Sequence, residues 1–307
     1  MAGIEVSGVA RAFGDVHAVR NATFTVEPGH VAGLIGPNGA GKTTLLLMLA
    51  TLLRPDAGAI RVAGFDPLTD PAEVRARMGW MPDLLGSWAS LTVREALVAS
   101  ARLYGRSTDV ATARAGELID LVDLDELADR PTRVLSRGQK QRLSLARALV
   151  HDPEVLLLDE PASGLDPVAR AGLRTLVRRL ASEGRTVLVS SHVLAELEEM
   201  ADQAVYLSAG VTAAADEIAR AASTARDWRL RSLDPDRLRV ALDAAGWAEV
   251  ARIDNLGAVV PLESEEAAAQ LLAHLIGSGV PVSSFAPAVG DLEHVFLDLS
   301  RNGEDDA

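Results

Sequence analysis

A glycine-rich stretch between an apolar strand and an apolar helix carries the clearest chemistry in this sequence. Residues 36–43 are Gly-Pro-Asn-Gly-Ala-Gly-Lys-Thr, with an apolar run at 31–35 before them and a helical run at 44–49 after them. Glycines leave the main chain unobstructed, so its N–H groups can wrap a polyphosphate, and a helix start adds unpaired N–H groups. Lys42 would reach the β and γ phosphates, and the Thr43 hydroxyl would bind Mg²⁺. The stretch predicts a nucleotide site; the alternative is a glycine-rich turn before a helix.

Two further apolar runs end in groups that can act on a phosphate. Residues 154–158 lead into Asp159 and Glu160, and residues 186–189 lead toward His192. Ligands of open α/β sheets lie at the carboxyl ends of the strands, so these groups should meet the glycine-rich loop. We expect Asp159 to help hold Mg²⁺, Glu160 to reach an attacking water and His192 to contact the γ-phosphate. The alternatives are an exposed turn for the two acids and a plain helix-start residue for the histidine.

Composition narrows the class of protein. The 307 residues suffice for one large or two modest domains, and 48% hydrophobic with 24% charged residues is typical of globular proteins. No cysteine is present, which excludes disulfides and thiolate metal sites. A net charge of −13 argues against non-specific nucleic-acid binding, which depends on neutralising phosphates. Neither a secretion signal nor an apolar run of membrane-spanning length is visible, so we expect a cytoplasmic protein that reaches a membrane only through a partner.

The segments around the loop have strand and helix signatures. Residues 4–9 and 22–26 alternate as half-buried antiparallel strands do. Phe13, in the turn expected between them, is either a core residue or a ring that stacks on a purine. A strand at 78–81 should end at Pro82 and leave Asp83 at its exit.

Residues 91–150 are expected to be helical. Thr92 with Glu95, and Ser136 with Gln139, have the spacing of capping boxes at two helix starts. Between them, residues 113–122 form the pattern of another amphipathic helix.

Beyond about residue 208 the pattern changes. An alanine-rich helical connector is expected at 212–225. Strands and helices then alternate as βαββαβ, the order of a split βαβ unit of ferredoxin-like type. The expected elements are strand 228–231, helix 235–245, strands 250–253 and 258–261, helix 263–276, strand 280–285 and a closing helix at 291–299. His274 and His294 are isolated and are expected to be surface residues.

Residues 4–207 resemble the ATP-binding subunit of an ABC (ATP-binding cassette) transporter, because the markers of that family occur in order. The first is Phe13 at the adenine-stacking position. The phosphate loop, Walker A, corresponds to Gly36, Pro37, Asn38, Gly39, Ala40, Gly41, Lys42, Thr43 and Thr44. The later markers are Asp83 at the Q-loop, 135–139 as the signature, 155–160 as Walker B, 163–166 as the D-loop and His192 as the switch histidine.

The resemblance implies a fold class and a domain organisation. We expect an α/β P-loop NTPase with a RecA-like core, an antiparallel β subdomain and an inserted helical subdomain at about 84–150. This ABC ATPase domain would span 1–210, and 211–307 would form a small α+β, ferredoxin-like accessory domain. The latter resembles the accessory region of bacterial multidrug and antibiotic-resistance exporters, including their Leu-Glu-x-Val-Phe-Leu ending at 292–297.

The resemblance also assigns roles. Two cassettes, expected to be identical, would face head to tail, with ATP held between the phosphate loop of one and Ser136, Gly138 and Gln139 of the other. Glu160 would polarise the attacking water and His192 would contact the γ-phosphate, while Thr43, Asp83 and Asp159 would hold Mg²⁺. Two positions depart from the family: Asp83 replaces the usual glutamine, which puts metal affinity or coupling in doubt, and Arg137 replaces the third residue of Leu-Ser-Gly-Gly-Gln.

These features favour the ATPase of an exporter, at the cytoplasmic face of the membrane, whose transmembrane permease subunits are separate chains. The apolar patch at 84–88 would either dock the permease or pack into the helical subdomain. The alternatives are an importer ATPase, or a soluble cassette acting on nucleic acid or ribosomes. The single cassette, the negative charge and the lack of sustained heptads disfavour a soluble cassette that acts on nucleic acid or ribosomes, so no nucleic-acid partner is expected.

Overall fold

The structure is a computed structural model that describes residues 3–84, 86, 88–247 and 250–305. The chain divides into two compact units, Met1–Ala213 and Ala214–Ala307. The strands of the first unit are β1 (Ile4–Phe13), β2 (Val16–Val26), β3 (Val31–Ile35), β4 (Ala57–Val62), β5 (Met78–Met81), β6 (Val155–Asp159), β7 (Thr186–Ser190), β8 (Gln203–Ser208) and β9 (Val211–Thr212). Its α-helices are α1 (Lys42–Leu49), α2 (Pro71–Arg77), α3 (Val93–Leu103), α4 (Thr108–Leu121), α5 (Arg137–Ala148), α6 (Pro167–Ser182) and α7 (Leu194–Glu198).

A mixed sheet of nine strands organises the first unit, in the order β4-β1-β2-β9-β8-β3-β7-β6-β5. The central strands β3, β6 and β7 are parallel, with Gly33 opposite Val189 and Leu157 opposite Leu188. All fifteen of their residues are buried, which explains their unbroken apolar sequences, because parallel strands are covered on both faces. Their carboxyl ends therefore lie along one edge of the sheet.

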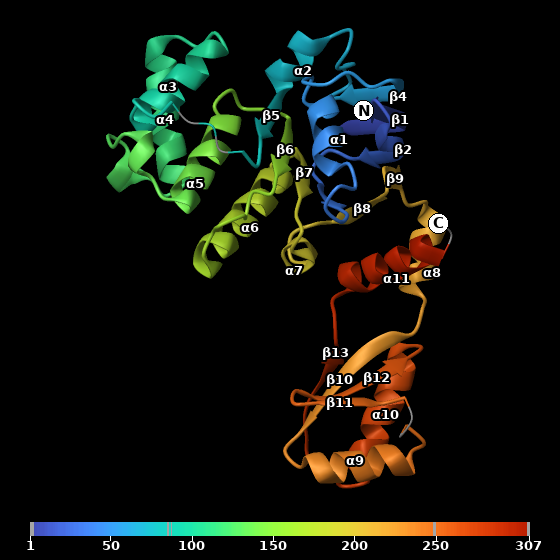
Figure 1. The fold of residues 1–307 in the computed structure, drawn as a ribbon. Coiled ribbons are helices and arrows are strands. Elements are labelled where there is room, and N and C mark those ends of the chain that lie inside the picture. Colours follow the sequence, from blue (N-terminus) through green and yellow to red (C-terminus); the bar gives the residue numbers. More distant parts are fainter. Residues whose placement is uncertain (1–2, 85, 87, 248–249, 306–307) are drawn as a thin grey trace. The chain divides into compact units, whose positions relative to one another are not determined.

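The antiparallel strands β1, β2 and β4 lie together at one end of this sheet, and β7, β6 and β5 lie at the other end (Figure 1). Their alternation buries Ile4, Val6 and Val62 against α1, whose Leu45 and Leu49 are fully buried in the same core. This arrangement anchors α1, and thus the loop before it, between the two parts of the sheet.

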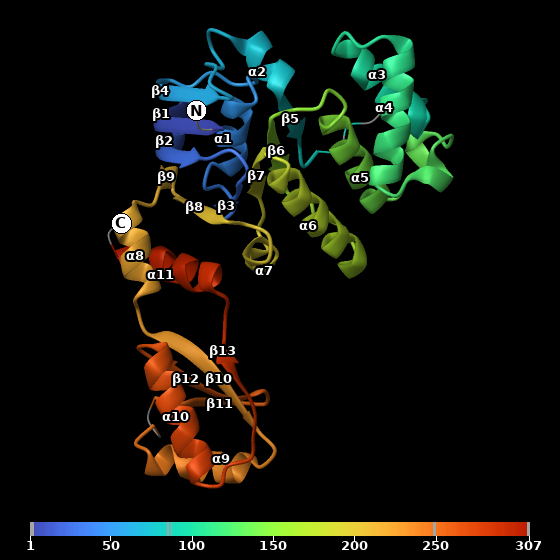
Figure 2. The same cartoon turned by 180° about the vertical axis from the view of Figure 1, so that it is seen from behind.

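Three helices, α3, α4 and α5, gather beside β5 and β6, away from β1 and β4 (Figure 2). Both predicted capping boxes are present: Thr92 caps α3 with Glu95, and Ser136 caps α5 with Gln139. Each cap satisfies main-chain N–H groups that the first helical turn would otherwise leave unpaired.

The second unit contains a four-stranded antiparallel sheet in the order β11-β12-β10-β13. Leu230, Leu242, Val260 and Leu275 are among the side chains of its separate apolar core. Outside this sheet, α8 and α11 pack against each other (Figure 1). The elements are α8 (Ala215–Ala222), β10 (Arg226–Ser232), α9 (Pro235–Ala244), β11 (Arg252–Asp254), β12 (Gly257–Leu262), α10 (Glu265–Gly277), β13 (Val282–Pro287) and α11 (Asp291–Asp305).

Several predicted boundaries shift. The first hairpin is longer than expected, and Phe13 ends β1 instead of lying in a turn, because β1 and β2 stay paired up to Phe13 and Val16. The connector predicted at 212–225 is helical only in α8, and the strand predicted to begin at residue 250 begins at Arg252. Residues 85 and 87 of the predicted apolar patch lie outside the described residues. No helix in the described part of the chain is both long and apolar enough to cross a bilayer.

Candidate functional site

The glycine-rich loop joins the carboxyl end of β3 to the start of α1, as its sequence predicts. Two glycines are required by close approach: a Cβ at Gly36 would lie 2.2 Å from the carbonyl oxygen of Leu207, and one at Gly41 would lie 2.2 Å from that of Ala18. Gly41 also has a φ of 103°, which favours glycine. Pro37, Asn38 and Gly39 form the exposed part of the loop, Ala40 is buried beneath it and Thr44 is half-buried in α1.

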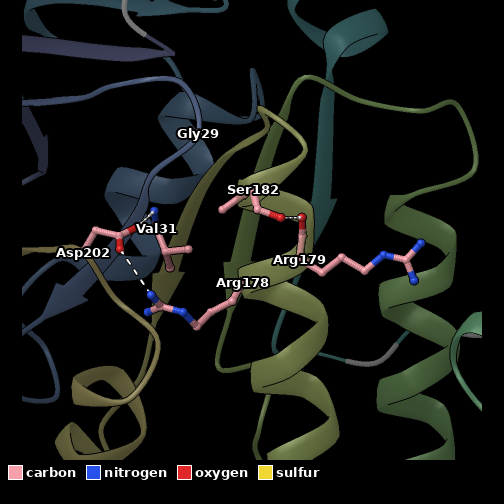
Figure 3. Close-up of a pocket in the computed structure, with 7 residues that line it drawn as sticks. Gly29, Val31, Arg178, Arg179, Ser182 and Asp202 are labelled. Atoms are coloured by element: carbon pink, nitrogen blue, oxygen red, sulfur yellow. Dashed lines mark hydrogen bonds and ion pairs between the residues drawn. The ribbon is translucent and has the colours of Figure 1, made fainter.

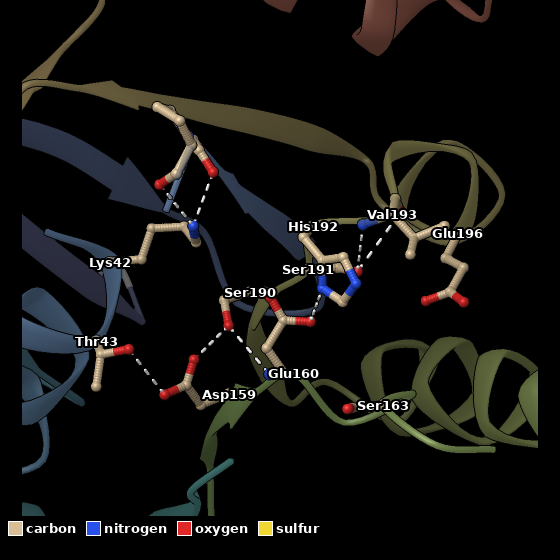
Figure 4. A network of polar contacts seen from close by, with 12 residues as sticks. Lys42, Thr43, Asp159, Glu160, Ser163, Ser190, Ser191, His192, Val193 and Glu196 are labelled. Carbon is tan, nitrogen blue, oxygen red and sulfur yellow. Dashed lines mark hydrogen bonds and ion pairs between the residues drawn. The ribbon is translucent and has the colours of Figure 1, made fainter. Parts of the chain in front are cut away.

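Lys42 folds back over the loop (Figure 4). Its Nζ donates to the carbonyl oxygens of Gly36, at 2.7 Å, and of Pro37, at 3.1 Å. Burial lowers the pKa of the ammonium, and the nearby carboxylates of Glu160 and Asp159 oppose this shift. The loop carbonyls therefore hold a positive charge inside the cradle that an anionic ligand would enter.

Asp159, at the end of β6, is the centre of a polar network (Figure 4). It is only 3% exposed. Its Oδ2 accepts from the Thr43 hydroxyl at 3.2 Å, and its Oδ1 accepts from the Ser190 hydroxyl at 2.5 Å. The contact with Ser190 follows from the register, because Asp159 and Ser190 are paired at the ends of β6 and β7. The structure therefore brings a hydroxyl of the loop helix and a buried carboxylate together, as the sequence predicted.

Glu160 follows directly and has an unusual backbone. Its φ of 50° is in the left-handed region, which costs a non-glycine residue about 1–3 kcal/mol. Its main chain is held on two sides: the N–H donates to the Ser190 hydroxyl at 3.1 Å, and the carbonyl accepts from the Gln141 amide at 2.8 Å. The Oε2 lies 2.7 Å from Nδ1 of His192, whose side chain is 62% exposed. The predicted acid and histidine thus form a contact beside the loop.

Two other predicted residues lie apart from this network. Phe13 is 48% exposed, and the guanidinium of Arg11 lies 4.8 Å from its ring centroid, so it is not a core residue. Asp83 is exposed, two residues beyond the end of β5, on the same edge of the sheet as Asp159. With the described residues, Asp83 makes no hydrogen bond or ion pair.

The predicted signature residues Ser136, Gly138 and Gln139 form the amino end of α5. The Ser136 hydroxyl accepts from the Gln139 N–H at 3.2 Å, and the Gln139 side chain accepts from the Ser136 N–H at 2.8 Å. This helix packs with α3, α4 and β5, whereas α1 packs with β2, β4 and β6. The phosphate loop before α1 and the predicted signature at the start of α5 therefore pack against different sets of helices and strands in one chain.

The sequence of this chain has known relatives. Residues 19–163 match the profile of the family described as ABC transporter. The daunorubicin/doxorubicin resistance ATP-binding protein DrrA of Streptomyces peucetius is 36% identical over 321 residues, covering 99% of this chain and 94% of DrrA. This chain belongs to the ABC transporter ATP-binding family. It is an ABC ATPase, and the α/β P-loop fold class predicted for its first unit is confirmed, with a mixed sheet.

One further relative and two solved structures agree with this family assignment. The Nod factor export ATP-binding protein I of Burkholderia lata is 41% identical over 210 residues, which are 68% of this chain and 69% of that protein. The solved structure of an ATP-binding subunit of an ABC transporter matches 71% of this chain and 92% of its own, at 29% identity and a TM-score of 0.65. A dimeric bacterial ABC transporter cassette matches 69% of this chain and 97% of its own, at 25% identity and a TM-score of 0.64.

Two residues of the polar network around Asp159 and Glu160 were missed by sequence reasoning. Ser190 could have been found, because it is a hydroxyl residue at the end of a buried strand whose neighbours were already assigned. Gln141 could not, because its position in α5 says nothing about the Glu160 carbonyl that it contacts.

A hollow of about 380 Å³ also lies at the opposite ends of the strands, where α6 finishes and β3 begins (Figure 3). The Asp202 carboxylate accepts from the Val31 N–H at 2.9 Å and lies 3.7 Å from the Arg178 guanidinium. Arg178 also donates to the carbonyl of Met200 at 3.1 Å. Because these polar groups pair with one another, they join α6 to β3. None of them is left unpaired to bind a ligand in the hollow, and we assign it none.

Proposed function

We propose that this ABC ATPase binds and hydrolyses ATP to drive export through separate membrane-spanning subunits. The observation that carries the proposal is the network at the carboxyl edge of the sheet, where Lys42, Thr43, Asp159, Glu160 and His192 converge on one loop. Main-chain amides and a lysine for phosphate, and a positioned carboxylate for water, are what phosphoryl transfer to water requires.

The chain's own groups have separable roles in that reaction. The loop amides and Lys42 bind the β and γ phosphates. Glu160 accepts a proton from the attacking water, while the backbone contacts from Ser190 and Gln141 fix the acid in place. His192, held by the Glu160 carboxylate, presents its exposed ring toward the γ-phosphate. Phe13, half exposed at the end of β1, offers a ring face to adenine.

The donor set fits Mg²⁺. Thr43 and Asp159 place a hydroxyl and a carboxylate oxygen 3.2 Å apart, and both are the hard oxygen ligands that Mg²⁺ prefers. No group of three or more acidic or histidine side chains that could hold a metal occurs among the described residues. Mg²⁺ usually takes only one or two carboxylates and completes its shell with phosphate oxygens and water. A Mg²⁺ site here therefore does not need such a group of three side chains. Thr43 and Asp159, with Asp83, would hold the ion, which would neutralise charge on the phosphates.

The active form would be a head-to-tail homodimer in which Ser136, Gly138 and Gln139 of one copy face the phosphates bound by the other. Two findings support this: the signature end of α5 and the phosphate loop pack in different parts of one chain, and a similar cassette has been solved as a dimer.

Export is supported by the relatives. DrrA, which this chain matches along nearly its whole length, is named for drug resistance, and a second relative is named for Nod factor export. The partner would be a transmembrane permease, and the ATPase would lie at the cytoplasmic face of the membrane. Leu84, 85% exposed, and Trp88, 41% exposed, would contribute to the docking surface. No observation favours nucleic acid as a partner.

The domain organisation is also a proposal. An ABC ATPase domain would span 1–210, with its helical subdomain at about 84–150, and an accessory domain would span 211–307. Within the latter, the order β10-α9-β11-β12-α10-β13 and the antiparallel sheet order β11-β12-β10-β13 support a ferredoxin-like assignment.

The test is Glu160→Gln in the full chain. Removing a positioned general base lowers a chemical rate by about 10² to 10⁴, so ATP should bind normally, hydrolysis should nearly stop and an ATP-dependent dimer should accumulate on size-exclusion chromatography. Glu154→Gln, at the residue just before β6 as Glu160 is the residue just after it, is the matched control and should keep both wild-type turnover and the monomer–dimer equilibrium. Turnover by Glu160→Gln at the wild-type rate would remove Glu160 from this role.

A further inference from the structure

A cavity of about 380 Å³ lies between α4, α5 and α6, with the end of β5 and the segment after Glu160 as its remaining walls. Its volume falls within the range of small-molecule sites, and its walls are mainly apolar, as such sites are. The apolar side chains of the walls include Met81, Leu121, Leu145, Leu165, Leu173 and Leu176.

The charged groups at the cavity leave a small negative excess. Arg142 donates to the carbonyl oxygen of Asp123 at 3.2 Å and lies 3.8 Å from its carboxylate. Asp166 accepts the N–H groups of Val168 and Ala169 at the start of α6. One guanidinium thus stands against two carboxylates, which disfavours an anionic ligand and favours an apolar molecule that is neutral or cationic.

The cavity is connected to the catalytic acid by one side chain. Gln141 is 2% exposed, lines the cavity and donates its amide to the Glu160 carbonyl at 2.8 Å. That hydrogen bond restrains a residue whose φ of 50° is unfavourable. The same carbonyl also accepts from the Ser163 N–H at 3.0 Å. A molecule in the cavity that displaced the Gln141 amide would therefore leave the Glu160 carbonyl with one donor in place of two and weaken the restraint on its backbone.

We propose that this cavity is a regulatory site for a small, neutral or cationic apolar molecule, whose binding slows ATP hydrolysis by displacing Gln141 from Glu160. The regulatory part rests on the proposed catalytic role of Glu160. Gln141 is a positioning residue in this scheme, since it acts on the reaction only through the acid.

The chain offers a matched pair of variants. Gly172 lies on α6 at the cavity, and a Cβ added there meets nothing within 4 Å, so Gly172→Phe fills the space without a backbone clash. Gly116, on α4, is also a helical glycine with open space around it, but it does not line the cavity. Both replacements remove a glycine from a helix interior and should be stabilising by about 0.5–1 kcal/mol before the added ring is considered.

The first measurement is binding of Nile red, a neutral apolar dye, to the full chain without nucleotide. We expect saturable binding to the wild type and to Gly116→Phe, and binding weakened at least about tenfold in Gly172→Phe because the ring occupies the cavity. The anionic dye anilinonaphthalene sulfonate should bind the wild type more weakly than Nile red does. Absence of Nile red binding, or equal affinity for the two phenylalanine variants, would overturn the site.

The second measurement is steady-state ATP hydrolysis at saturating dye. Nile red should lower kcat without changing KM for ATP in the wild type and in Gly116→Phe, and should have no effect on Gly172→Phe. Gln141→Leu should still bind the dye, with a lowered kcat, an unchanged KM and no further response. Dye binding without any change in kcat would refute the link through Gln141. Absence of hydrolysis by the wild type would instead count against the proposed function, because dye binding is measured separately.

Discussion

His151 makes the stability of the first unit depend on pH. The residue lies between α5 and β6 and is 5% exposed. Its ring stacks on Tyr104, with centroids 3.8 Å apart and planes 5° from parallel, and its Nε2 lies 3.2 Å from the Met78 carbonyl oxygen. A carbonyl only accepts, so Nε2 carries the proton of the neutral ring, and Nδ1 is buried without a partner in the described structure. Protonating that nitrogen would place a charge in the interior.

Burial lowers the pKa of His151 from 6.5 to about 4, although the hydrogen bond to Met78 opposes the shift. The folded-state pKa is therefore below the unfolded-state pKa, so the unfolded chain binds the proton more tightly. Above pH 6.5 the ring is neutral in both the folded and the unfolded chain, so it does not change the free energy of unfolding. As the pH drops from 6.5 toward 4, the unfolded chain takes up the proton and the free energy of unfolding falls. The full shift corresponds to about 3 kcal/mol, of which about 1 kcal/mol should already be lost at pH 5.5 relative to pH 7.5.

The assay compares urea unfolding of the full chain at pH 7.5 and 5.5, followed by tryptophan fluorescence. The lower pH stays above the isoelectric point of about 4.9. His151→Phe keeps a ring to stack on Tyr104 but cannot be protonated, so it should lose about 1 kcal/mol less than the wild type between the two pH values. Its lost hydrogen bond to Met78 affects both pH values equally and cancels in the difference.

His274→Phe, which replaces an exposed histidine of α10, is the control and should keep the wild-type pH dependence. If His151→Phe and the wild type lost the same free energy between pH 7.5 and 5.5, His151 would not be a buried neutral group, and the explanation would fail.

Three further predictions concern the ATP site. In the proposed site, Lys42→Ala would remove a charge-assisted contact to phosphate worth about 1.5–3 kcal/mol, so the Kd for a fluorescent ATP analogue should rise about 10- to 100-fold. An unchanged Kd would place the lysine outside the site. Phe13→Ala should weaken the same binding severalfold while Phe13→Trp retains it, which would show that a ring face contacts the base. Ser190→Ala leaves the buried Asp159 carboxylate without its 2.5 Å donor, and calorimetry should show a loss of about 1–3 kcal/mol; an unaltered Tm would contradict this.

Much of the fold could be predicted because its signals are local. The unbroken apolar runs of β3, β6 and β7 identify buried parallel strands, and the carboxyl ends of such strands share one edge of the sheet. The positions of Thr43, Asp159 and Ser190 beside one another follow from that rule. The two capping boxes are also local, since donor and acceptor lie three residues apart.

The contacts that tune the site are not local. Gln141 meets the Glu160 carbonyl because α5 packs against β5, and neither residue type carries that information. The exposure of Phe13 depends on how far the β1–β2 hairpin extends, and the burial of His151 depends on Tyr104, which is 47 residues earlier in the chain. Side-chain contacts across packed elements are set by volumes and orientations that a pattern of residue types does not specify.

Arg137 illustrates what the geometry adds to a noted departure in sequence. The arginine replaces a residue of the family signature, and its guanidinium donates to the Ser163 hydroxyl at 2.7 Å. Its side chain also lies over Gly164, where a Cβ would be 2.7 Å from the arginine Cδ. The amino end of α5 is thus joined to the segment that follows Glu160 within the same chain. Any displacement of that helix end must either carry Ser163 with it or break this bond, so two side chains of α5 join this helix to Glu160 and the segment after it: Gln141 at Glu160 itself and Arg137 at Ser163.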